Sequence, residues 1–194
     1  MPLSRGSTFK MGCKEKWGAE CMNLDLAEYT ALITTFSALG TATLLWNLYW
    51  EQRRIRWLAS TVIGFSGYKN KSSRYSDDRK IRSKAEEFCQ ITRDNLNNHI
   101  NTSNEIEKDQ LRFSIKKIDR ILDDLKNKPR GDPSNFSRRQ RKGLIKLDKS
   151  LIRELDDLTK ISARMNENSL EELNSGLQNA GEALTKRTTL VTSI

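Results

Sequence analysis

Histidine, cysteine, proline and aromatic residues are all scarce in this chain. Its 194 residues include one His, three Cys and three Pro, and the aromatic share is 7%. Because His99 is the only histidine, no Ser-His-Asp set and no histidine metal cluster can be assembled, and the sequence has no Gly-rich phosphate loop. We therefore expect a protein that is not an enzyme and that carries no cofactor or metal.

The chain has an odd number of cysteines, and no two of them stand at the short spacing typical of a metal or redox motif. Cys13, Cys21 and Cys89 therefore predict neither a disulfide framework nor a zinc site. Cys89 lies on an apolar helical stripe, and we expect it to be a small core residue. The few prolines leave long stretches free to form uninterrupted helices, since Pro129 and Pro133 fall close together.

Positive charge exceeds negative charge. Lys and Arg number 34 against 25 Asp and Glu, a formal net charge of +9. Such an excess favours an anionic partner, either the headgroups of a membrane or a nucleic acid. We expect membrane lipid as the first of these, and nucleic acid as the less favoured alternative.

The longest uncharged stretch, residues 29–50, organises the sequence. A helix of this length covers the hydrocarbon core of a bilayer, and aromatic residues followed by arginines stand at its far end. We predict a single transmembrane helix, with the positive residues behind it placing the C-terminal part in the cytoplasm. The predicted interface residues are Tyr29, Trp46, Tyr49, Trp50, Arg53, Arg54 and Arg56.

Seven hydroxyl and amide residues make this stretch only moderately apolar, so a long buried core helix is the alternative. Within it, small side chains gather on one side at spacings of four, three and four. Small side chains let helices approach closely, which predicts a self-association surface, although small residues are also common in such helices. The four residues are Thr30, Thr34, Ser37 and Thr41.

The remainder of the chain is predicted to be helical. Residues 1–28 form a flexible segment, residues 51–76 a basic juxtamembrane segment, residues 77–187 a helical domain and residues 188–194 a frayed tail. Ser76 with Asp77 and Asp78 has the pattern of a helix start, and the Pro- and Gly-containing residues 126–137 form the one clear break.

Two apolar seams run through the predicted domain with alternating steps of three and four. Their residues are Leu111, Ile115, Ile118, Leu122, Leu125, Leu151, Leu155 and Leu158. Each stripe is narrow and needs a partner. We favour an all-α fold in which the helices on either side of the break form an antiparallel pair within a bundle or coiled-coil hairpin. A parallel oligomer of extended coils is the competing arrangement.

A cluster of cations follows the break. We expect them first of all to form a solvated helix start. As the second interpretation, Arg138, Arg139, Arg141 and Lys142 bind phosphates of lipid or nucleic acid.

Three functions are consistent with these features. The first is a membrane-anchored interaction protein, a scaffold, adaptor or regulatory subunit that meets a protein partner or its own copies through helices. The second is an effector that self-associates and permeabilises the bilayer. The third is a basic helical protein that binds nucleic acid and keeps residues 29–50 in its core.

Overall fold

The computed structural model describes residues 26–101, 104–128, 136–165 and 169–192. These residues form helices and connecting loops without a strand, so the predicted all-α class is confirmed. Most of the predicted segment 1–28, including Cys13 and Cys21, lies outside the described residues. The helices are α1 (Leu26–Thr61), α2 (Lys71–Ile100), α3 (Glu105–Asn127), α4 (Arg138–Ala163) and α5 (Ser169–Thr192).

The chain divides into two compact units, Met1–Trp50 and Glu51–Ile194, and the division falls inside α1. The part of α1 before the division exposes the side chains of Thr30, Ala31 and residues 33–49 to solvent. The predicted alternative, a helix buried in the core, is therefore not what this segment forms.

The predicted transmembrane helix is wrong. Among the helices in the described part of the chain, none is long and apolar enough to cross a membrane. The cause lies in the composition of residues 29–50, where threonines, Ser37 and Asn47 alternate with the apolar side chains and dilute them. The predicted single-pass localisation, with a cytoplasmic C-terminal part, depends on that span and is wrong for the same reason.

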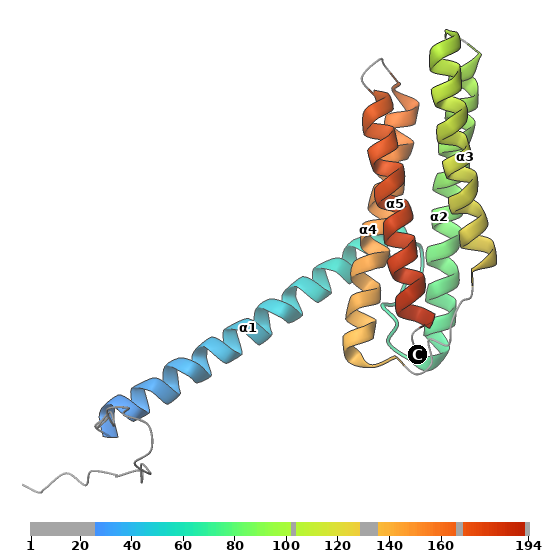
Figure 1. The fold of residues 1–194 in the computed structure, drawn as a ribbon. Coiled ribbons are helices and arrows are strands. Elements are labelled where there is room, and N and C mark those ends of the chain that lie inside the picture. The colour runs from blue at the N-terminus through green and yellow to red at the C-terminus, as the bar shows by residue number, and fades with distance from the viewer. Residues whose placement is uncertain (1–25, 102–103, 129–135, 166–168, 193–194) are drawn as a thin grey trace, which may run out of the picture. The chain divides into compact units, whose positions relative to one another are not determined.

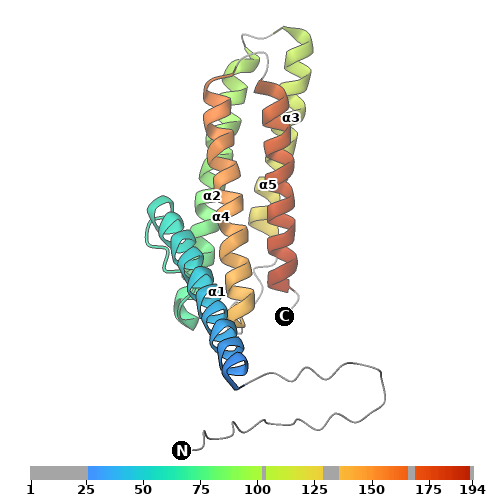
Figure 2. The same cartoon turned by 90° about the vertical axis from the view of Figure 1, so that its left-hand side faces the viewer.

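Helices α2 to α5 form a four-helix bundle (Figure 1), which confirms the predicted bundle. The packed neighbours are α2 with α3, α3 with α5, α5 with α4, and α4 with α2. The predicted antiparallel pair, α3 with α4, is thus a diagonal pair, and the paired hairpins are α2–α3 and α4–α5. Figure 2 shows the four helices running alongside one another. A helical stripe fixes which face is buried and leaves the choice of partner open, which explains the difference.

The predicted seams lie in the core of this bundle. Seven of the eight side chains are buried, and Ile115 is partly buried against them. The buried seven are Leu111, Ile118, Leu122, Leu125, Leu151, Leu155 and Leu158. Cys89 is buried in the same core, as a residue on an apolar helical stripe should be.

Capping residues set where the helices begin. Helix α4 follows Ser137, whose Oγ accepts a hydrogen bond from the N–H of Gln140 at 3.2 Å, while the Gln140 side chain accepts one from the Ser137 N–H at 2.9 Å. Helix α3 ends at Asn127, so α3 and α4 flank the predicted break, of which residues 129–135 lie outside the described part. Helix α2 begins at Lys71, before the start expected at Ser76.

The second unit contains more than the four bundle helices. The last turns of α1 and the loop of residues 62–70 contribute Leu58, Val62, Phe65 and Tyr68 to the core. The predicted juxtamembrane segment 51–76 is therefore largely a packed element of this unit.

Candidate interaction surfaces

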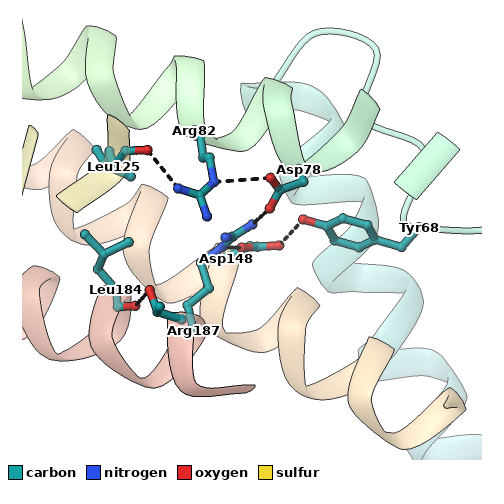
Figure 3. A network of polar contacts seen from close by, with 8 residues as sticks. Tyr68, Asp78, Arg82, Leu125, Asp148, Leu184 and Arg187 are labelled. Atoms are coloured by element: carbon teal, nitrogen blue, oxygen red, sulfur yellow. Dashed lines mark hydrogen bonds and ion pairs between the residues drawn. The ribbon is translucent and has the colours of Figure 1, made fainter. Parts of the chain in front are cut away.

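A cluster of charged side chains is buried inside the bundle (Figure 3). At its centre Arg187 of α5 donates from Nε to the Asp148 carboxylate of α4 at 2.6 Å and from Nη2 to the Asp78 carboxylate of α2. Arg187 and Asp148 are fully buried, and Asp78 retains only 4% of its accessible surface. Because unpaired buried charge is very unfavourable, these three side chains fix the positions of their helices relative to one another.

Two further side chains complete this buried polar cluster (Figure 3). The Tyr68 hydroxyl donates to Asp148 at 2.6 Å. Arg82 donates to Asp78 at 3.2 Å and to the Leu125 carbonyl of α3 at 2.7 Å. Burial, with the charge of Asp148 beside it, raises the pKa of Tyr68 well above its ordinary value, so the phenol remains a donor. Two guanidinium groups face two carboxylates, and all lie away from solvent, so the cluster's chemistry is structural.

The loop that carries Tyr68 is held by a second carboxylate. Asp77 accepts hydrogen bonds from the Ser66 N–H at 3.0 Å, the Ser66 hydroxyl at 2.8 Å and the Tyr68 N–H at 2.8 Å. Tyr68 has φ of 57°, in the left-handed region that a bulky residue rarely adopts. Asp77 and Asp78, expected in the first turn of a helix, lie within α2 instead, and both are buried and bind other parts of the fold.

The cations predicted to form a phosphate patch do not act as one group. Arg138 and Arg139 are exposed at the start of α4. Arg141 and Lys142 lie on either side of the buried Glu51 carboxylate of α1, at 2.6 and 3.1 Å. Burial alone would raise the pKa of Glu51, but hydrogen bonds from Lys142 and Arg141 outweigh it and lower the pKa. These two cations join the end of α1 to α4.

Next to this junction lies a group of cations from two helices, which we call the basic surface: Arg53 and Arg54 of α1 with Lys149 and Arg153 of α4. Burial, together with the positive charges of the three arginines, lowers the pKa of Lys149 below its ordinary value. The Lys149 ammonium lies 5.5 Å from the centre of the Trp57 ring. Arg53, Arg54 and Arg56 were expected to face lipid headgroups; the first two instead lie on a surface shared with α4.

An acidic groove runs between α4 and α5. Four carboxylate residues line this open depression of about 720 Å³, with Leu158 and Ile161 among the apolar lining. The four are Glu154, Asp157, Glu171 and Glu172. Within the part of the chain that the structure describes, no group of three or more His, Cys, Asp or Glu residues is placed to hold a metal ion.

His99 also has a structural role. Its Nε2 lies 3.1 Å from the Ser162 carbonyl of α4, and the neighbouring Asn95 donates to the Ser162 hydroxyl at 3.0 Å. These bonds join α2 to α4 at the end of the bundle away from Arg187.

The first unit presents a different surface. Large side chains of α1 between residues 33 and 49 are strongly exposed, for example Phe36 at 71% and Leu39 and Trp46 at 64%. The threonine hydroxyls in the same segment bond to their own helix: Thr34 donates to the Ala31 carbonyl at 2.9 Å and Thr41 to the Ala38 carbonyl at 2.9 Å. These threonine hydroxyls therefore have hydrogen-bond partners within the helix, and the large exposed side chains of the segment are apolar. Three of the predicted aromatic anchors pack on one another: the ring centres of Trp46 and Trp50 lie 5.7 Å apart, and those of Tyr49 and Trp50 lie 5.9 Å apart.

These observations define an all-α protein built from a helical segment with an exposed apolar surface and a four-helix bundle fixed by buried ion pairs. Comparison of the chain with known protein families, curated proteins and solved structures finds no match.

Proposed function

We propose that this chain is a helical interaction protein, a scaffold or adaptor without catalytic activity, whose copies associate through residues 30–50 of α1. One observation carries the proposal: the large apolar side chains of this segment are exposed in the single chain. Exposed apolar surface that is contiguous marks an interaction site in most proteins.

The area available is sufficient for a pair of copies. Ile33, Phe36, Leu39, Leu44 and Trp46 lie within about half of the helix circumference at 3.6 residues per turn. With exposed fractions between 52% and 71%, they offer roughly 600 Å² per copy, if a whole aromatic side chain counts as about 150–250 Å² and an aliphatic one somewhat less. Two copies would bury about 1,200 Å², at the lower limit of stable interfaces.

A second copy suits this surface chemically. Residues 29–50 contain no charged residue, so pairing two copies desolvates no ion and brings no like charges together. The small side chains Thr34, Ala38 and Thr41 lie on the opposite side of the helix, so this interface is formed by the large apolar side chains alone.

Sedimentation velocity of the full chain over a range of concentrations tests the proposal. We expect a defined dimer or small oligomer. Leu39→Glu places a charge in the interface and should shift the species to monomer, whereas the matched variant Gln90→Glu on the exposed face of α2 should not. A chain that stays monomeric at all concentrations contradicts the proposal, and so does a polydisperse aggregate that Leu39→Glu leaves unchanged.

A further inference from the structure

The basic surface gathers like charges from two helices. Arg53 and Arg54 of α1 and Lys149 and Arg153 of α4 come from helical turns almost a hundred residues apart in the sequence. The two helices meet here, because the Lys149 ammonium of α4 lies 5.5 Å from the centre of the Trp57 ring, one helical turn after Arg53 on α1. Burial, together with the positive charges of the three arginines, lowers the pKa of Lys149. Like charges held together repel one another, and an anionic ligand bound across them would reduce that repulsion.

The ion pair beside this surface keeps the two helices in place. Glu51 is bound by Arg141 at 2.6 Å and by Lys142 at 3.1 Å, two residues before Arg53 on α1. Within the surface itself, Arg153 meets Asp157 only loosely, at 3.7 Å, with both side chains about half exposed or more. Such a pair contributes little and leaves Arg153 able to exchange it for a stronger anion.

The row of cations on α4 that contains Lys149 and Arg153, and that Lys146 extends beyond the basic surface, suits a chain of phosphates. Lys146, Lys149 and Arg153 follow one another on the same face of α4 at steps of three and four. The distance from Lys146 to Arg153 along the helix is about 10 Å at 1.5 Å per residue. One strand of a duplex advances about 3.4 Å per phosphate along the axis, so about three steps between phosphates match this length. Guanidinium groups also match phosphate oxygens in two-point contacts.

A protein partner fits this surface less well. Protein interfaces depend on buried aromatic and aliphatic anchors at their centre. The large apolar side chains that are exposed in the described residues lie elsewhere, and none belongs to α4 or to residues 51–61 of α1. Binding to a nucleic acid backbone needs no such anchor, because it is dominated by cations that replace counterions.

We infer that the basic surface, formed by Arg53, Arg54, Lys149 and Arg153, binds the phosphodiester backbone of nucleic acid without reading its sequence. The inference is independent of the self-association proposed above, since the residues and the measurements are different.

Fluorescence anisotropy with the full chain and a short labelled single-stranded oligonucleotide of mixed sequence tests the inference. Four phosphate contacts predict a slope of log K against log[NaCl] of about −2.8, which is a loss of affinity of about 50-fold between 50 and 200 mM salt. Neutralising one arginine from each helix in Arg53→Gln/Arg153→Gln should halve the slope and reduce that loss to about sevenfold. A second sequence of the same length should bind equally well.

Two controls separate this site from general charge. Arg53→Lys/Arg153→Lys keeps the cations and should keep the salt slope. The pair Lys160→Gln/Lys186→Gln removes the same charge from exposed lysines that already face carboxylates, and it should leave the slope close to −2.8.

Three results would overturn the inference: undetectable binding at low salt, an equal loss of slope in the Lys160→Gln/Lys186→Gln control, or competition by polyglutamate as strong as by unlabelled oligonucleotide. The last result would assign the surface to an acidic protein partner.

Discussion

Removing the guanidinium of Arg187 should destabilise the bundle far more than its single side chain suggests. In Arg187→Met the Asp148 carboxylate loses the hydrogen bond that Arg187 Nε donates at 2.6 Å, and the Asp78 carboxylate loses the one that Nη2 donates. Breaking a buried ion pair by removing one partner costs about 3–5 kcal/mol, a large fraction of the roughly 5–15 kcal/mol typical of a domain. Lys186→Met changes the exposed neighbouring residue and should cost less than about 0.5 kcal/mol.

The decisive comparison is a double-mutant cycle. Asp148→Asn alone leaves Arg187 with one carboxylate instead of two and should cost about 3 kcal/mol. In Arg187→Met/Asp148→Asn the remaining charges, Asp78 and Arg82, still balance, and the amide carbonyl introduced at position 148 can accept from Tyr68. The double variant should therefore be more stable than the sum of the single effects predicts, by about 2–3 kcal/mol.

Urea unfolding followed by far-ultraviolet circular dichroism measures each free energy of unfolding, and equal m-values show that the variants unfold from comparable structures. If the single effects add to within about 0.5 kcal/mol, the two side chains do not interact as described, and the reasoning about the buried polar cluster is refuted.

Three further outcomes follow from the described contacts. Burial raises the pKa of the Cys89 thiol to about 12, so with the other cysteines changed to serine a thiol reagent near pH 8 should label the native chain very slowly and the urea-unfolded chain rapidly; rapid native labelling would contradict its burial. Glu51 has a lowered pKa, so its ion pairs add stability above the unfolded pKa of about 4.5. That stability is lost as pH falls through the folded pKa, and the gap in thermal midpoint between the wild type and Glu51→Gln should close in acid. Gly67 has φ of 83° and its added Cβ would lie 3.2 Å from Ile55, so Gly67→Ala should cost about 1–3 kcal/mol, whereas Gly181→Ala, in open space on α5, should be neutral or stabilising by up to about 1 kcal/mol.

Periodicity in the sequence predicts most of the helical content and the buried faces. The steps of three and four from Leu111 to Leu125 mark the side of α3 that faces the core, because a helix repeats every 3.6 residues. The Pro- and Gly-containing break falls between Asn127 and Arg138, where α3 ends and α4 begins. Proline cannot donate a helical hydrogen bond, so such boundaries are visible without a structure.

Periodicity does not identify which helices are neighbours. Arg187 meets Asp78 across 109 positions of sequence and Asp148 across 39. Asp78 on its own has the pattern of an exposed residue in a first turn, since carboxylates favour that position. An apolar stripe shows which face of a helix is buried, but not which helix packs against it. The diagonal arrangement of α3 and α4 and the buried polar cluster are therefore seen only in the structure.

The basic surface was only partly predictable. Arg53 and Arg54 were assigned to headgroups because they follow an uncharged stretch, and Lys149 and Arg153 were not singled out. One signal was present: Lys142, Lys146, Lys149 and Arg153 follow one another at steps of four, three and four. Spacing in the sequence does not predict that residues 51–54 of α1 lie beside this row of cations. The ion pair between Glu51 and Arg141 that holds α1 there joins residues 90 positions apart.

The central claim, that copies associate through residues 30–50 of α1, is tested most directly by a distance between copies. A nitroxide on Ala38→Cys, near the middle of this segment, with Cys13 and Cys21 changed to serine, can be measured by double electron–electron resonance. Helices packed about 8–10 Å apart place two such labels within about 30 Å in either relative direction, and dilution with unlabelled chain should remove the coupling. A distance in that range is the predicted result, and no dipolar coupling at any concentration would contradict the claim.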